Sequence, residues 1–349
     1  MSGTLARAFL LTPLHLTVAG AGLVGKRHVT AIAQVPGVDL AGIVDPAPEA
    51  GDYAATLGVP LHDSLDDHFN ATKPDGVILA TPTPLHVEQG LACIRAGIPV
   101  LIEKPIAVSA ADAEPMVAEA ETAGVPILVG HHRRHNPLIQ KAKEIIESGR
   151  LGDIRAVHAQ CWFHKPTHYF DEAPWRKKRG AGPISVNLVH DVDLLRYLCG
   201  EITDVQSMAA PSLRGYENED TAAALLRFAN GAIGTLTVSD SIAAPWSWEH
   251  TAREYPVYPV TNESCYRIGG TLASLSIPDM AIWSHTGDPD WWSPITAEHT
   301  PRPGADPLVN QIAQFAQVIR GEAPPLVSGR EGLETLRVIE AIGDVVLWL

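Results

Sequence analysis

Residues 16–25, with the sequence LTVAGAGLVG, decide the fold that we expect. The apolar run Leu16–Ala19 is typical of a buried strand, and a helix is predicted over Leu23–Gln34. Between them stands the pattern GxGxxG, whose glycines are Gly20, Gly22 and Gly25. In this context the first glycine permits a tight turn, the second admits a pyrophosphate to the backbone, and the third lets helix and strand pack closely. The segment therefore predicts a dinucleotide-binding Rossmann domain.

An acidic residue follows at the position where such domains bind the adenosine ribose. A second strand is predicted over Val38–Val44, and Asp45 comes directly after it. A carboxylate there accepts hydrogen bonds from ribose hydroxyls and repels a 2′-phosphate. We therefore expect NAD as the cofactor, with NADP as the alternative because Lys26 and Arg27 lie nearby in the sequence and would offset the carboxylate. The residues expected to bind the dinucleotide here are Gly20, Gly22, Leu23, Val24, Gly25 and Asp45.

Strands and helices keep alternating up to residue 130. Further strands are predicted over 75–80, 100–102 and 125–129. Thr83 as N-cap and Pro84 at the first helical position predict one helix start, and Ser109 opens a capping box before a helix that ends at Gly124. This alternation predicts an α/β Rossmann fold with a doubly wound parallel sheet.

The pattern changes after residue 130 to that of an α+β domain with a large, mainly antiparallel sheet and helices on one face. A helix is predicted over 138–147 and strands over 154–162, 205–210, 222–228 and 233–240. Asn230-Gly231 predicts a type I′ hairpin turn. Helices over 307–319 and 331–347 close the chain, and the fold of 241–305 is left open. We expect residues 1–130 to bind NAD(P), and 131–349 to bind substrate and to oligomerise, with the terminal helix free to pack back on the first domain.

Composition narrows the partners and the compartment. The formal net charge of −14 disfavours nucleic acid and anionic membrane surfaces. The apolar run Ala8–Leu11 is shorter than the core of a secretory signal, and no stretch approaches the roughly 20 apolar residues that span a bilayer. The cysteines are scattered, so a reducing, cytoplasmic location is expected. The expected partner is a small-molecule substrate. No metal site is expected, because adjacent histidines such as His131 and His132 diverge on a strand.

Four segments resemble the glucose–fructose oxidoreductase/inositol dehydrogenase/MocA family: Gly20–His28, Ala80–His86, Glu103–Pro105 and Gly182–Arg196. The resemblance covers nearly the whole chain. It implies that Lys104 lies beside the nicotinamide and the substrate, where a partly buried lysine exchanges a proton with a substrate hydroxyl. It also implies that Glu103, Thr81, Pro82 and His86 flank the cofactor.

In the last segment the family shows an aspartate, three residues and then a histidine. That histidine matches His190, which orients the substrate hydroxyl or relays its proton. The aspartate position falls on Val186, and we expect Asn187 to supply a neutral hydrogen-bonding group instead. Asparagine cannot accept a proton, so this departure puts a carboxylate-assisted relay in doubt. Further substrate-binding candidates are Arg133, Lys165, Tyr169, Trp175 and Arg176.

The function that we expect is reversible hydride transfer between the nicotinamide and a hydroxyl carbon of a sugar, polyol or inositol, or a related small molecule. One alternative is a lyase or glycoside hydrolase on the same fold that recycles its NAD. Another is a non-catalytic protein that senses the cofactor. An apolar sheet face predicts a homodimer or homotetramer.

Overall fold

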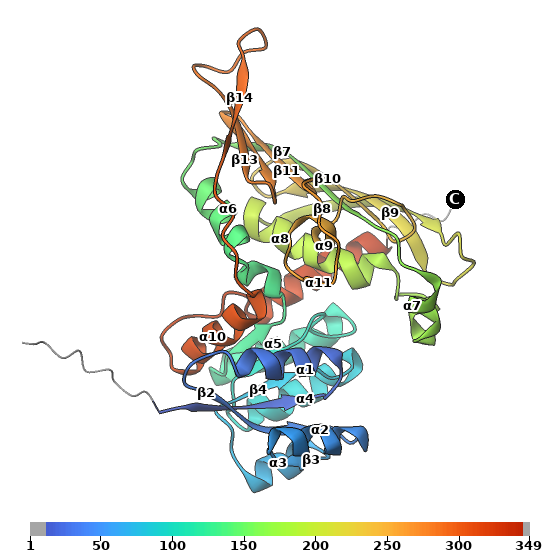
Figure 1. Cartoon of the computed structure of the whole chain (residues 1–349), viewed down its shortest axis with the longest axis vertical. Coiled ribbons are helices and arrows are strands. Elements are labelled where there is room, and N and C mark those ends of the chain that lie inside the picture. Colours follow the sequence, from blue (N-terminus) through green and yellow to red (C-terminus); the bar gives the residue numbers. More distant parts are fainter. Residues whose placement is uncertain (1–11, 345–349) are drawn as a thin grey trace, which may run out of the picture. The chain divides into compact units, whose positions relative to one another are not determined.

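The computed structural model describes residues 12–344 (Figure 1). They form two compact units: one runs up to Gly130 and includes Leu308–Gly329, and the other comprises His131–Pro307 and the chain from Arg330 onward. The run Ala8–Leu11 and the end of the predicted terminal helix lie outside the described residues. Within residues 12–344, no helix is both long enough and apolar enough to cross a membrane.

A six-stranded parallel sheet forms the first unit, as predicted. Its order is β3-β2-β1-β4-β5-β6, so the direction of winding reverses between β1 and β4. Ligands of open α/β sheets bind at this reversal, beyond the carboxyl ends of the strands. The strands are β1 (Leu14–Ala19), β2 (Val38–Val44), β3 (Leu61–His62), β4 (Gly76–Leu79), β5 (Val100–Ile102) and β6 (Ile127–Val129).

The helices of this unit differ from the prediction at one start. Thr83 and Pro84 belong to a 3₁₀ turn, Thr83–Leu85, and α4 begins only at His86. Thr83 is therefore not an α-helical N-cap. Ser109, in contrast, caps α5 by accepting from the Asp112 N–H, as predicted. The helices are α1 (Leu23–Ile32), α2 (Glu49–Leu57), α3 (Leu65–Ala71), α4 (His86–Arg95) and α5 (Ala110–Ala123).

A late helix, α10 (Pro307–Ile319), also packs in the first unit. Its buried residues Leu308, Ile312 and Phe315 share a hydrophobic core with β1, β4 and β5. The expected undivided second domain over 131–349 is thus interrupted by residues 308–329. The helix that returns to the first unit is α10, because its apolar stripe covers that sheet, whereas the terminal helix α11 (Gly329–Asp344) buries Ile339 and Ile342 in the second unit.

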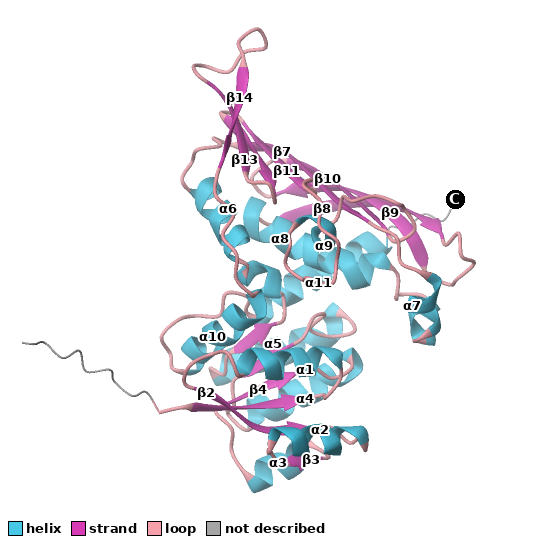
Figure 2. Ribbon diagram, viewed as in Figure 1, coloured by secondary structure: helices cyan, strands magenta, loops and turns pink. Residues whose placement is uncertain are grey.

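The second unit contains an eight-stranded sheet in the order β14-β13-β12-β11-β7-β10-β9-β8, in which only β7 and β10 pair in parallel. Helices cover one face of it (Figure 2). The strands are β7 (Ile154–Trp162), β8 (Ile202–Pro211), β9 (Glu219–Phe228), β10 (Ile233–Ser239), β11 (Tyr266–Gly270), β12 (Ala273–Ile277), β13 (Ala281–His285) and β14 (Ile295–His299). The helices besides α11 are α6 (Pro137–Glu147), α7 (Thr167–Asp171), α8 (Val189–Cys199) and α9 (Trp248–Thr251). The stretch 241–305 supplies the last four strands.

The hairpin between β9 and β10 forms where predicted, but its turn is not type I′. Gly231 has φ 85°, whereas Asn230 is not among the residues with positive φ. The Gly231 N–H donates to the Phe228 carbonyl, as in a type I turn followed by a left-handed glycine. Asn230 keeps its ordinary backbone because its side chain accepts from the Ala232 N–H and donates to the Cys199 carbonyl.

Candidate functional site

The three glycines after β1 serve three different purposes. Gly20 has φ 93°, and a Cβ there would lie 2.5 Å from the Ala80 oxygen. A Cβ on Gly25 would lie 1.8 Å from the Gly20 oxygen, so this glycine lets α1 pack against the turn. A Cβ on Gly22 would meet nothing within 4 Å. Gly22 is also the N-cap of α1 and no side chain caps that end, so the helix N–H groups face open space suited to a diphosphate.

Asp45 anchors the neighbouring turn and keeps capacity for a ligand. Its Oδ2 accepts from the Ala21 N–H at 2.6 Å and its Oδ1 from the Ala47 N–H at 2.8 Å. Each carboxylate oxygen has a further lone pair, so two ribose hydroxyls can still donate to it.

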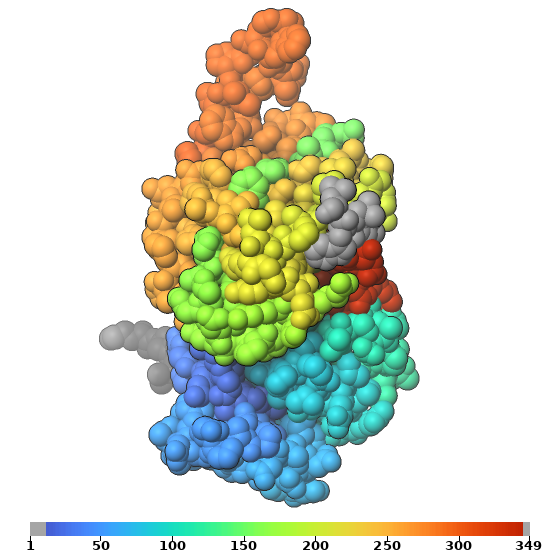
Figure 3. Space-filling view, turned by 90° about the vertical axis from the view of Figure 1, so that its right-hand side faces the viewer, coloured from blue at the N-terminus to red at the C-terminus, as the bar shows by residue number. Residues whose placement is uncertain are grey.

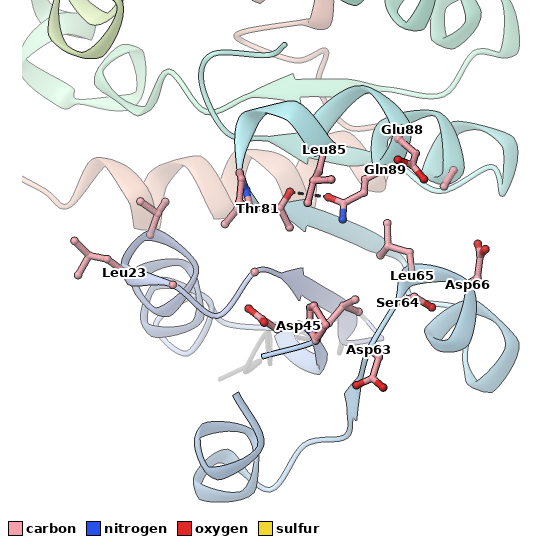
Figure 4. A pocket seen from close by; sticks show the side chains of 18 residues that line it. Leu23, Asp45, Asp63, Ser64, Leu65, Asp66, Thr81, Leu85, Glu88 and Gln89 are labelled. Carbon is pink, nitrogen blue, oxygen red and sulfur yellow. Dashed lines mark hydrogen bonds between the residues drawn. The ribbon is translucent and has the colours of Figure 1, made fainter. Parts of the chain in front are cut away.

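A pocket of about 690 Å³ opens at this edge of the sheet (Figure 4). The predicted residues that line it are Gly20, Gly22, Leu23, Val24, Asp45, Thr81 and Pro82. The other lining residues were not predicted, and they come from the end of β2, the β3–α3 segment, the segment after β4 and α4: Val44, Pro46, Asp63, Ser64, Leu65, Asp66, Ala80, Leu85, Glu88, Gln89 and Ala92. Ser64 left a sequence signal, because it caps α3 by accepting from the Asp67 N–H, as the pattern Ser-x-x-Asp predicts.

The pocket is acidic. Four carboxylates line it, and neither Lys26 nor Arg27 does. The Lys26 ammonium instead lies 4.8 Å from the centre of the Tyr53 ring. The compensation that would favour a 2′-phosphate is therefore missing from the pocket walls. The carboxylates are those of Asp45, Asp63, Asp66 and Glu88.

Lys104 follows β5 and begins a turn whose Lys104–Pro105 peptide is cis. Glu103 supports this turn: its carboxylate accepts from the Lys104 N–H at 3.2 Å and contacts Nε2 of His28 in α1 at 2.8 Å. Glu103 thereby links the turn to the helix of the glycine loop. His28 is a further residue of this site that was not among the predicted ones, although it ends the first of the four family segments.

In the second unit, four predicted substrate residues come together. The Lys165 ammonium donates to Oδ1 of Asn187 at 2.7 Å and lies 5.1 Å from the centre of the Tyr169 ring. Arg176 stacks on the same ring at 3.9 Å. Burial lowers the pKa of Lys165, and the nearby Asp240 carboxylate, 3.4 Å away, acts in the opposite direction. Trp175, another of the predicted substrate residues, is exposed.

Asn187 lies in a π-helical turn and His190 in the first turn of the α-helix that follows it. Asn187 belongs to a π-helical turn, Ile184–Leu188, that leads directly into α8, where His190 is 8% exposed. The Ile184 N–H at the start of this turn donates to the Glu219 carboxylate. The His190 ring lies edge-on to His132, with ring centres 5.3 Å apart. Such π turns recur at functional sites.

Arg133 has a different environment from the one we expected. It lies in a 3₁₀ turn, His132–His135, and is 5% exposed. Its guanidinium pairs with Glu249 at 2.7 Å and with Asp191 at 3.5 Å. Burial raises the pKa of Asp191 to about 6, and Arg133 opposes that rise. Because its charge is already balanced by internal carboxylates, Arg133 fits an internal supporting role better than direct substrate binding.

Comparison with protein families assigns both halves of the chain. Residues 14–131 match the family described as oxidoreductase family, NAD-binding Rossmann fold, and residues 139–276 match the GFO/IDH/MocA C-terminal domain. This chain belongs to the GFO/IDH/MocA oxidoreductase family. The first unit of this family member is therefore its NAD-binding Rossmann domain, and the pocket beside Gly22 and Asp45 fits that dinucleotide by its space, its free N–H groups and its ribose acceptors.

Several relatives of this oxidoreductase are known enzymes. It is 30% identical over 237 residues to 4-carboxy-2-hydroxymuconate-6-semialdehyde dehydrogenase of Sphingobium sp., covering 65% of this chain and 72% of the relative. It is 31% identical over 228 residues to inositol 2-dehydrogenase 2 of Saccharopolyspora erythraea, covering 63% and 65%. The WlbA dehydrogenase structure from Bordetella pertussis, in complex with NADH and UDP-GlcNAcA, superposes with a TM-score of 0.76 at 30% identity, covering 95% of this chain and 96% of that one.

Proposed function

We propose that this protein reversibly oxidises a hydroxyl-bearing carbon of a sugar, a polyol such as inositol, or a related small molecule, with NAD taking up the hydride. One observation carries the proposal. Lys104 stands at the carboxyl end of β5, the same edge of the sheet at which the β1 glycine loop and Asp45 lie. The named activity of one relative, inositol 2-dehydrogenase 2, supports this class of substrate.

In this proposal Lys104 accepts the hydroxyl proton, since an amine placed beside the reacting carbon is a suitable base. His190 orients the hydroxyl or relays its proton. Asn187, Lys165, Tyr169 and Arg176 bind other oxygens of the substrate, the amide of Asn187 without taking a proton.

The test is the substitution Lys104→Ala. We expect kcat to fall about 100-fold or more, because a general base is lost. The Kd for NAD, measured by fluorescence titration, should change less than about threefold, because the lost contact acts in the reaction rather than in dinucleotide binding. A panel of sugars, inositols and hydroxy acids supplies the substrate. Unchanged turnover would contradict the role of Lys104.

The same panel separates the other two functions. A recycling lyase or glycoside hydrolase releases product without net NADH, and a cofactor sensor binds NAD without turnover. The comparisons support neither. We expect NADH to accumulate in proportion to the oxidised product.

We also propose a homodimer or homotetramer and a cytoplasmic location. The face of the second sheet opposite the helices presents Met208, Leu225 and Ile233, whose strands pair so that the three share that face. The hairpin of β13 and β14 stands away from the rest of this unit, and its tip holds Trp291 and Trp292, 86% and 85% exposed (Figure 3). Apolar surface of this kind favours burial against a second copy. Light scattering should give a dimeric or tetrameric mass, and a monomer would contradict the proposal.

A further inference from the structure

His86 lies between two loops of the first unit rather than on a wall of the dinucleotide pocket. It is the first residue of α4, and it is 1% exposed. The imidazole is therefore too deeply buried to touch a bound dinucleotide directly, which was its expected role. Whatever it contributes must pass through the groups that surround it.

Both ring nitrogens of His86 face backbone carbonyl oxygens. Nε2 lies 2.9 Å from the Thr81 oxygen and Nδ1 lies 3.0 Å from the Pro105 oxygen. Carbonyls only accept, so a neutral ring donates to one of them and a protonated ring to both. Burial lowers the pKa of His86, while the two carbonyls and the Glu103 carboxylate act against that effect.

These two carbonyls belong to the segments that matter for the reaction. Thr81 follows β4 and lines the dinucleotide pocket, and Pro105 follows Lys104. Gln89, one turn further along α4, accepts from the Thr81 hydroxyl at 2.6 Å. Helix α4 thus holds Thr81 through two side chains and the Lys104–Pro105 turn through His86, while Glu103 holds the same turn from α1 through His28.

We propose that His86 is a positioning residue that ties the loop after β4 to the Lys104–Pro105 turn and so fixes the backbone that carries Lys104. The proposal rests on the proposed function only through the role of Lys104. Restricting this backbone favours turnover, because a reacting group held in place saves the entropy of orienting it.

The experiment compares three variants of the full chain. His86→Leu removes both ring nitrogens at similar volume, and His86→Gln restores an amide with two N–H groups. His68→Leu is the matched control, since His68 is also fully buried in the first unit but bonds to Thr17, away from both loops. The first readout is amide hydrogen exchange over residues 81–85 and 103–108, which requires no substrate. The second is kcat together with the Kd for NAD.

For His86→Leu we expect exchange in both segments to rise about tenfold or more, since the imidazole that packs between them and donates to their carbonyls is lost. We expect kcat to fall about tenfold or more while the Kd for NAD changes less than about threefold. His86→Gln should recover part of the lost protection from exchange and part of the lost kcat, and His68→Leu should lower stability without altering exchange in these segments.

Three outcomes would each overturn the proposal: unchanged exchange in His86→Leu, an equal rise of exchange in His68→Leu, or faster exchange in His86→Leu with normal kcat. Absence of dehydrogenase activity in the unsubstituted protein would instead refute the proposed function. Hydrogen exchange would still test whether His86 links the two loops.

Discussion

Asp45 is one of several residues whose charge bears on the choice of dinucleotide. Its carboxylate holds the N–H groups of Ala21 and Ala47, and it stands among three further carboxylates in the pocket. A 2′-phosphate would meet this negative charge without a cation among the lining residues. The negative charge that opposes a 2′-phosphate therefore belongs to a group of residues, in which Asp45 is the member that also shapes the loop.

We predict that Asp45→Asn weakens NAD binding about tenfold, since hydrogen bonds to a charged acceptor contribute roughly 1.5–3 kcal/mol and an amide retains part of that. NADP should lose less, because one repulsive charge is removed, yet NAD should remain preferred owing to Asp63, Asp66 and Glu88. Fluorescence titration with both dinucleotides gives the two Kd values. Asp75→Asn is the control. Asp75 directly precedes β4, at the edge of the sheet opposite the pocket, and its carboxylate accepts from the His15 N–H. An unchanged ratio of the two Kd values would count against the assignment.

At the scale of an element, the junction of β1 and α1 assigns dinucleotide binding and helix packing to different glycines. Gly22 borders open space, whereas Gly25 touches the Gly20 carbonyl. Both belong to one motif, and only the space around each distinguishes them. Two methyl groups added three residues apart should therefore have different consequences.

We predict that Gly22→Ala leaves the midpoint of thermal unfolding within about 2 °C of the unsubstituted protein while weakening NAD binding about tenfold, because its methyl group enters the diphosphate space. Gly25→Ala should lower both the midpoint of thermal unfolding and the affinity for NAD, because its Cβ would overlap the Gly20 oxygen and push α1 away from the turn. Calorimetry supplies the midpoints and the affinities. Equal loss of stability in the two variants would contradict this division.

At the scale of the whole molecule, the chain leaves the first unit at residue 130 and returns to it for residues 308–329. The return contributes α10, and it also places Val327 beside β6, where its carbonyl accepts from the Val129 N–H. The core of the NAD-binding domain is therefore completed by residues that begin 178 positions after Gly130, at Leu308.

We predict that a fragment of residues 12–130 aggregates and does not bind NAD, because it exposes the surface that Leu308, Ile312 and Phe315 cover. Joining residue 130 to 307–329 through a flexible linker should restore a cooperative unfolding transition and NAD binding. Circular dichroism and NAD titration test both fragments. Equal behaviour of the two would show that α10 is dispensable.

The sequence by itself determined the features that depend on neighbouring residues. The glycine motif, the alternation of strand and helix, and the caps at Ser109 and Gly124 each depend on near neighbours, because strand and helix periods and caps are local properties. These features were enough to predict the Rossmann sheet, the antiparallel sheet and the position of Asp45 after β2.

Only the tertiary structure decided which distant residues meet. His28 reaches Glu103 across 75 positions, and Arg133 is held by Glu249 across 116. The register of β2 with β3 brings Asp63 to the pocket, and the packing of α4 turns His86 away from it. Ion pairing and burial depend on the folded positions of both partners, and no local pattern in the sequence records them.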